Sequence, residues 1–252
     1  MDNLDRLNEK LRSRQRVFGY TSYLPSTYSL KEYMPEGVDY ILFDCEHGPH
    51  DEDWYSTYYR LCRSLGIPTV TRVANAEYHL IARATDCGSD GVMIPRVETM
   101  EQVEEAVRGL YLPPVGKKGY GGKFQFYPGE DVPSYNRRRV LWLQIESPKG
   151  AEILPSVLDR FGNYVSACVI GPADLSVNVG KPLDFYGEES LAVIRKTYEI
   201  CERYGISSGS YCFDEEDAKK RIALGTTLVW MQSDASYMTE GIRRAAAAIA
   251  AI

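Results

Sequence analysis

Short apolar segments alternate with longer amphipathic segments along most of the chain. The apolar segments are rich in β-branched and aromatic residues, and each is followed by a stretch whose apolar positions recur at helical spacing. This alternation is typical of parallel βαβ units, and the nearly continuous hydrophobic runs VDYILFD, VLWLQIE and VSACVIG indicate strands covered on both faces. The eight predicted strands span residues 17–23, 38–43, 68–73, 91–94, 140–145, 165–170, 206–211 and 227–231.

The intervening segments carry helix signals at both ends. Several begin with acidic residues and end at glycine, as in DEDWYSTYYRLCRSLG and EESLAVIRKTYEICERYG. Eight strand–helix pairs in 252 residues match the size of an α/β fold of the (β/α)₈ TIM barrel type, whereas an open doubly wound sheet usually has fewer strands. We therefore predict one barrel domain over residues 1–252, interrupted by a long loop rich in Gly, Pro and aromatic residues at about 112–139.

Composition and charge narrow the class of protein. The chain is 44% hydrophobic and 25% charged, and its formal net charge of −6 disfavours binding to nucleic acid or to an anionic membrane. It contains no apolar run of membrane-spanning length, and its polar amino terminus lacks the apolar centre of a secretory signal. The six cysteines form no C-x-x-C pair, which indicates reduced thiols and, with the rest, a cytoplasmic protein.

Polar residues with catalytic chemistry follow the predicted strands. In a barrel enzyme the carboxyl ends of the strands form the active site. Asp44, His47 and Arg72 follow the second and third strands, and Glu146 and Asp174 follow the fifth and sixth. Two carboxylates on neighbouring strands suit a hard divalent cation, a histidine suits a base, and an arginine can neutralise an enolate or carboxylate oxygen.

Each of these residues also has a structural interpretation. Glu146 could be a buried carboxylate paired with an arginine, Asp174 a helix cap, and Arg72 an ion-pair partner of Glu46 or Asp44. His47 and His50 could bind zinc, but their spacing matches no standard zinc motif. Arg96 is a weaker candidate of the same kind as Arg72.

At these residues the chain resembles the HpcH/HpaI family of metal-dependent (class II) pyruvate aldolases. FDCEHGP, LQIE and IGPADLS occur here in that order, and the similarity extends through PTVTRV, GVMIPRVET, LPPVGKKGYGG and ALGTTLVWMQSD. The resemblance implies a (β/α)₈ barrel that assembles as a homohexamer, a trimer of dimers that exchange their last helix. It also implies Mg²⁺ or Mn²⁺ as the cofactor, with Co²⁺ as a further option.

The resemblance assigns roles residue by residue. Glu146 and Asp174 match the metal ligands, Arg72 the enolate stabiliser and His47 the base. Asp86 in ATDCG falls where the family has the acid that pairs with this histidine, and Asp44 is a supporting residue. Gln144 and the backbone at Ala173 would line the keto-acid pocket.

The implied reaction is the reversible aldol cleavage of a 4-hydroxy-2-oxo acid to pyruvate and an aldehyde. The acceptor half departs from the family: Lys118 stands where an arginine is typical, and Tyr211 is bulkier than expected. We expect that Lys118 could bind an anionic acceptor tail. Two alternatives stay open, namely a Claisen-type synthase that joins oxaloacetate to acetyl-CoA, as in siderophore pathways, and a non-catalytic barrel that binds a keto acid.

Overall fold

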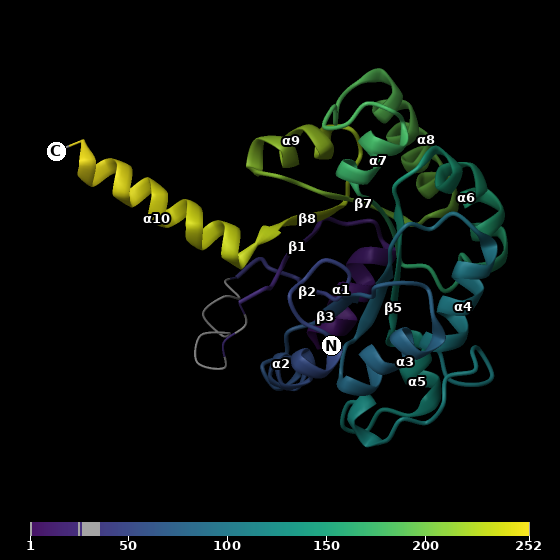
Figure 1. Ribbon diagram of the computed structural model, residues 1–252. Helices are drawn as coiled ribbons and strands as arrows, with labels where there is room; N and C mark the ends of the chain where they lie inside the picture. Colours follow the sequence, from purple (N-terminus) through teal and green to yellow (C-terminus); the bar gives the residue numbers. More distant parts are fainter. Residues whose placement is uncertain (1, 25, 27–35, 252) are drawn as a thin grey trace.

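Eight parallel strands form the centre of the molecule (Figure 1), and each coincides with one of the predicted runs. The computed structural model describes residues 2–24, 26 and 36–251, so the ends of the predicted domain at residues 1 and 252 lie outside the described residues. The strands are β1 (Val17–Thr21), β2 (Tyr40–Asp44), β3 (Thr69–Arg72), β4 (Gly91–Ile94), β5 (Val140–Ile145), β6 (Ala167–Ile170), β7 (Ser207–Tyr211) and β8 (Leu228–Ser233).

The strands close into a ring. Each strand pairs in parallel with the next one along the chain, and β8 pairs in parallel with β1. The single-domain (β/α)₈ barrel predicted from the sequence is confirmed. Because all strands run in the same direction, their carboxyl ends meet at one mouth, where the functional residues are expected.

Helices cover the outside of the ring. Their starts follow the sequence signals: Asp51, Thr99 and Ser147 each cap a helix by accepting a backbone N–H bond. None of the described helices is both long and apolar enough to cross a membrane. The helices that follow strands are α2 (Glu52–Ser64), α3 (Tyr78–Cys87), α4 (Met100–Leu110), α6 (Pro148–Phe161), α7 (Pro172–Asn178), α8 (Glu188–Tyr204), α9 (Glu215–Ala223) and α10 (Asp234–Ala250).

The amino end of the barrel is closed by α1 (Asn3–Arg12), which precedes the first strand. Its apolar face buries Leu4, Leu7 and Leu11 in one cluster with Tyr40 and Trp142, two residues of the strands. The rings of Tyr40 and Trp142 meet edge to face at 4.8 Å. Because this end is filled with apolar side chains, the mouth at the other end is the place for a ligand.

The segment 112–139 is more ordered than the long loop predicted for it. It contains a short 3₁₀ turn, η2 (Lys123–Gln125), and a helix, α5 (Val132–Arg138). Asp131 and Ser134 form a reciprocal capping box and Pro133 lies in the first turn of α5, so the local sequence does encode this helix. The abundance of Gly and Pro on its amino-terminal side hid that signal.

Candidate active site

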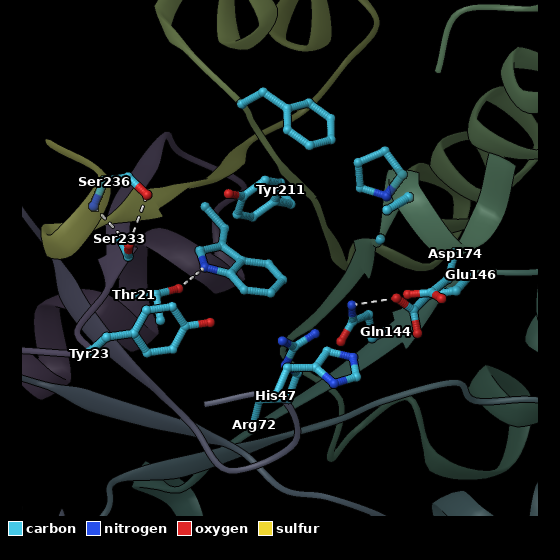
Figure 2. A pocket seen from close by; sticks show the side chains of 15 residues that line it. Thr21, Tyr23, His47, Arg72, Gln144, Glu146, Asp174, Tyr211, Ser233 and Ser236 are labelled. Atoms are coloured by element: carbon cyan, nitrogen blue, oxygen red, sulfur yellow. Dashed lines mark hydrogen bonds between the residues drawn. The ribbon is translucent and has the colours of Figure 1, made fainter. Parts of the chain in front are cut away.

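A cavity of about 270 Å³ opens at the carboxyl ends of the strands (Figure 2). All the strands that carry predicted site residues contribute to it. The lining residues are Thr21, Tyr23, His47, Arg72, Gln144, Glu146, Gly171, Pro172, Ala173, Asp174, Tyr211, Phe213, Trp230, Ser233 and Ser236.

Arg72 at the end of β3 is fixed by a two-pronged ion pair with Asp44 at the end of β2. Its Nε and Nη2 atoms donate to the two oxygens of Asp44 at 2.8 and 2.5 Å. Burial alone would raise the pKa of Asp44, but the hydrogen bonds and charge of Arg72 outweigh it and keep that pKa below its usual value. Tyr23 donates a further bond to Asp44 at 2.9 Å. The ion pair expected as the structural interpretation therefore exists, and it holds the guanidinium at the cavity wall.

Glu46 connects three cationic groups around the mouth. Its carboxylate lies 3.3 Å from Arg72 Nη1, 3.2 Å from Arg96 Nε and 3.8 Å from His47 Nε2. Burial raises the pKa of Glu46, while the neighbouring Arg72, His47 and Arg96 act against the rise. From the sequence, Glu46 was expected only as an ion-pair partner of Arg72. The structure shows that its carboxylate also lies beside His47 of the same chain.

His47 lies at the cavity mouth and its side chain is 61% exposed. This position allows the imidazole to exchange protons with a ligand or with water. The other histidines lie elsewhere: His50 stacks on Trp54 at 3.4 Å, and His79 is exposed beside Glu77. Within the described part of the chain, no group of three or more His, Cys, Asp or Glu side chains forms a metal cluster, so the zinc interpretation has no support.

Asp86 and Lys118 are not brought to this cavity. They form an ion pair with each other, and Lys118 Nζ also donates to Gln125 Oε1 at 2.7 Å. The side chain of Lys118 is buried inside its own loop, which leaves it turned away from a ligand. Within one chain, the structure therefore places neither Asp86 nor Lys118 at the cavity that His47 lines.

Glu146, directly after β5, is buried against the cavity with only 3% of its surface exposed. Its Oε1 accepts a 2.6 Å bond from Gln144 Nε2, and its Oε2 accepts a 3.1 Å bond from the backbone N–H of Arg96. Arg96 reaches that position with a left-handed backbone, φ 49°. Among the described residues, no arginine side chain pairs with Glu146. The structural interpretation, in which Glu146 is a buried partner of an arginine, is therefore not supported.

A second carboxylate faces Glu146. Asp174 lies in the first turn of α7, and its side chain makes no hydrogen bond or ion pair with any described residue. It therefore does not act as the helix cap that the structural interpretation expected, and the cap position of α7 is Gly171. Burial, followed by the charges of Asp174 and Glu46, raises the pKa of Glu146 to about 8. Figure 2 shows both carboxyl groups on the same side of the cavity.

The donor set around these carboxylates fits a hard divalent cation. Two carboxylates that repel each other are relieved by a cation between them. Gln144 Oε1 is buried without a hydrogen-bond partner, so one further oxygen is available there. Gly171 provides the space, since a Cβ atom at this position would overlap Glu146 Oε1. Only two protein carboxylates contribute, which leaves coordination positions for a substrate.

The opposite side of the cavity is made of hydroxyl groups and rings that sequence reasoning missed. Ser233 ends β8 and Ser236 lies in the first turn of α10, with their hydroxyl groups 3.0 Å apart. Thr21 accepts a 2.7 Å bond from Trp230 Nε1. The available signal was position, because Tyr23 ends the first predicted strand and Ser233 lies two residues after the last one, where a polar residue can face the mouth.

Comparison with known proteins identifies the family. The sequence profile described as HpcH/HpaI aldolase/citrate lyase matches residues 22–240. The chain belongs to this family. A hydroxypyruvate/pyruvate aldolase of Delftia acidovorans is 30% identical over 91% of this chain and 87% of its own length. A pyruvate aldolase of Rhizobium etli is 28% identical over 98% of both chains.

Solved structures agree with this assignment. An HpcH/HpaI aldolase from Desulfitobacterium hafniense superimposes with a TM-score of 0.87 over 96% of both chains, at 25% identity. The citrate synthase SbnG reaches a TM-score of 0.82 over 96% of both chains, but at 20% identity the likeness extends to the fold alone. The HpcH/HpaI protein described here is an aldolase-type enzyme, a carbon–carbon lyase, and such aldolases generally depend on a divalent metal ion.

Most of the expected site residues of this HpcH/HpaI aldolase line one cavity. They are His47, Arg72, Gln144, Glu146, Ala173 and Asp174. Asp44 supports them through its ion pair with Arg72. Asp86 and Lys118 are the two expected residues that the fold places elsewhere.

Proposed function

We propose that this aldolase cleaves a 4-hydroxy-2-oxo acid reversibly to pyruvate and an aldehyde, with Mg²⁺ or Mn²⁺ held by Glu146 and Asp174. The observation that supports this most is the shared cavity, in which two carboxyl groups without an ion-pair partner lie with a guanidinium that Asp44 fixes in place. Negative charge that develops on a keto acid between them would meet positive charge on both sides once the cation is bound. When bound, the cation would polarise the carbonyl group of the keto acid.

The side chains of the chain supply the remaining chemistry. In cleavage, His47 takes the proton of the C4 hydroxyl group, the C3–C4 bond breaks, and its electron pair stays on the keto-acid half as an enolate. Arg72 stabilises the enolate oxygen, and the aldehyde leaves. A proton returned to C3 then completes pyruvate. Gln144 and the backbone at Ala173 line the keto-acid part of the cavity.

The first half of this reaction has a direct test. With Mg²⁺ or Mn²⁺, the protein should exchange the C3 protons of pyruvate with deuterated water, as followed by proton NMR. We expect Glu146→Gln to lower the exchange rate about a hundredfold or more, because it removes one of the two carboxylate ligands. Glu101→Gln, at an exposed position in the first turn of α4, is the matched control and should exchange normally. Exchange that is absent, or that survives Glu146→Gln, would contradict the proposal.

We also propose that the protein is a homo-oligomer, a hexamer built from dimers that exchange α10. In Figure 1 this helix projects away from the barrel, and none of its described side chains is buried. Met238, Ile242 and Ile249 are apolar and largely exposed on it. Exposed apolar side chains along one helix are typical of a surface that another chain covers.

A further inference from the structure

The wall of the cavity away from the carboxylates is formed by aromatic rings. Tyr211 ends β7, and its ring meets Phe213 edge to face at 5.2 Å and Trp230 at 5.0 Å. Phe185, which does not line the cavity, stacks on Phe213 with the ring centroids 4.5 Å apart. This contact holds the ring of Phe213 in place. Figure 2 shows Tyr211 and Tyr23 on the side of the cavity opposite to Glu146 and Asp174.

Most polar groups on this wall are already paired. Tyr23 donates its hydroxyl proton to Asp44, and Thr21 accepts from Trp230. Ser233 and Ser236 bond to each other. The hydroxyl group of Tyr211 makes no hydrogen bond with any described residue, so the wall offers a ligand ring surface and this one neutral polar group.

The wall also lacks a free positive charge. Arg72 is the only arginine or lysine among the described lining residues, it pairs with Asp44 and Glu46, and the proposed reaction uses its charge at the enolate oxygen. Lys118, which could have bound an anion, is buried against Asp86. A carboxylate or phosphate on the acceptor would be desolvated at this wall without an arginine or lysine as its partner, which is unfavourable.

We propose that the aldehyde partner of this enzyme is an uncharged aromatic aldehyde whose ring packs against Tyr211 and Phe213. The inference rests on the proposed aldolase reaction and names its acceptor. In condensation, C3 of the pyruvate enolate attacks the aldehyde carbon, a C–C bond forms, and the aldehyde oxygen takes a proton to become the C4 hydroxyl group. The cavity of about 270 Å³ is at the small end for ligand sites and suits one ring rather than an extended chain.

The rings decide between aromatic and aliphatic acceptors. Offset or edge-to-face packing of two rings adds about 0.5–1.5 kcal/mol beyond the burial of apolar area, which corresponds to roughly a two- to tenfold preference. Against a charged aldehyde the preference should be larger, because a buried unpaired carboxylate carries a desolvation cost as well. The expected order is benzaldehyde, then propanal, then succinic semialdehyde.

The test uses the full-length enzyme with Mg²⁺, pyruvate and each of these three aldehydes in turn. We expect kcat/KM for benzaldehyde to exceed that for propanal severalfold and that for succinic semialdehyde at least tenfold. Phe213→Leu should remove the preference for benzaldehyde over propanal through the acceptor KM, and Phe213→Tyr should restore it because it keeps the ring. Phe124→Leu, at an exposed position outside the cavity lining, is the control and should keep the wild-type preference.

A binding measurement supports the kinetics without turnover. Benzyl alcohol is an unreactive analogue of benzaldehyde, and saturation-transfer NMR should detect its ring protons when it binds to the wild type. We expect weaker signals with Tyr211→Leu. This variant also replaces Phe213→Leu if that protein does not fold. Equal or better turnover of succinic semialdehyde, or an unchanged preference in both variants, would overturn the inference. If pyruvate exchanges its C3 protons but benzaldehyde is not preferred, only the proposed aromatic acceptor is refuted. If pyruvate does not exchange these protons, the aldolase proposal itself is refuted.

Discussion

Gly171 is the residue whose missing side chain makes room for the two proposed metal ligands. Its φ of −96° is open to any residue, so an alanine would be harmful only through its Cβ atom. That atom would overlap Glu146 Oε1 and lie 2.7 Å from Gln144 Nε2, both held by hydrogen bonds. A methyl group here must therefore displace Glu146 from its place beside Asp174.

We predict that Gly171→Ala binds Mn²⁺ at least tenfold more weakly than the wild type while keeping its fold. Isothermal titration with MnCl₂ measures the affinity, and circular dichroism checks the fold. Gly119→Ala is the matched control, since a Cβ atom there has its nearest neighbour at an ordinary 3.6 Å. Unchanged Mn²⁺ affinity in Gly171→Ala would mean that the cation does not bind at Glu146.

The raised pKa of Glu146 makes the stability of the metal-free protein depend on pH. The carboxyl group has an ordinary pKa of 4.5 when exposed in the unfolded chain and about 8 in the folded protein. Between these values the folded state holds a proton that the unfolded state has lost. The stabilisation from this group is therefore complete below about pH 4.5 and is lost as the pH rises through about 8.

This dependence should disappear in Glu146→Gln, which carries no ionisable group. In EDTA, the free energy of unfolding of the wild type should fall relative to that of the variant by on the order of 2 kcal/mol between pH 6 and pH 9. Urea unfolding of both proteins at the two pH values measures the difference. Mg²⁺ should restore the wild type at pH 9, and a difference that is independent of pH would refute the assignment.

Position along the strands predicted the charged part of the site, since any polar residue that follows a barrel strand faces the mouth. Glu146, Asp174, Arg72 and His47 were found in this way. The ion pair between Lys118 and Asp86 was not predictable from the sequence. It joins α3 to the segment 112–139, and how close these two come depends on how the whole segment folds.

At the scale of elements, every strand of the barrel was predicted, most clearly β2 and β5, which are buried on both faces and leave a continuous apolar run. β7, with the sequence SSGSY, is buried through small residues and has no such run. Helix ends were predictable where caps are strong, as at Asp51. The pattern failed for α5, which has only seven residues and buries one of them, Tyr135, too little for a periodic signal.

The helix α10 shows the limit of reasoning on one chain. Its sequence predicts a helix, and the structure has one. Among the described residues, its contacts with the barrel lie near its first turn, where Asp234 accepts hydrogen bonds from Ser22 and Tyr23 and where Tyr237 packs on the core. Most helical stability in proteins comes from tertiary packing of one face, and the side chains of α10 beyond its first turns are exposed. Packing of this part of α10 against a second chain would supply that stability, which gives the proposed exchange of the helix its physical reason.

The molecule as a whole thus presents an apolar surface at two connected places. One is the exposed face of α10, and the other is a groove of about 470 Å³ at the root of that helix. An exchanged helix would bury its apolar face against a second copy, and a closed symmetric assembly would leave no such surface open. The groove is lined by Phe18, Tyr20, Leu24, Val38, Asp234, Tyr237 and Met238.

Charges placed on this helix should dissociate the assembly. We predict that the double variant Met238→Glu, Ile242→Glu lowers the molar mass measured by light scattering after size-exclusion chromatography, because two carboxylates would be buried without partners in each exchanged interface. Arg243→Gln with Arg244→Gln, on the same helix, makes the same change of net charge and should stay assembled. A wild type that elutes as a monomer at micromolar concentration would refute the exchange of α10, whereas a hexamer that survives the double variant would move the contact between chains to another face of the barrel.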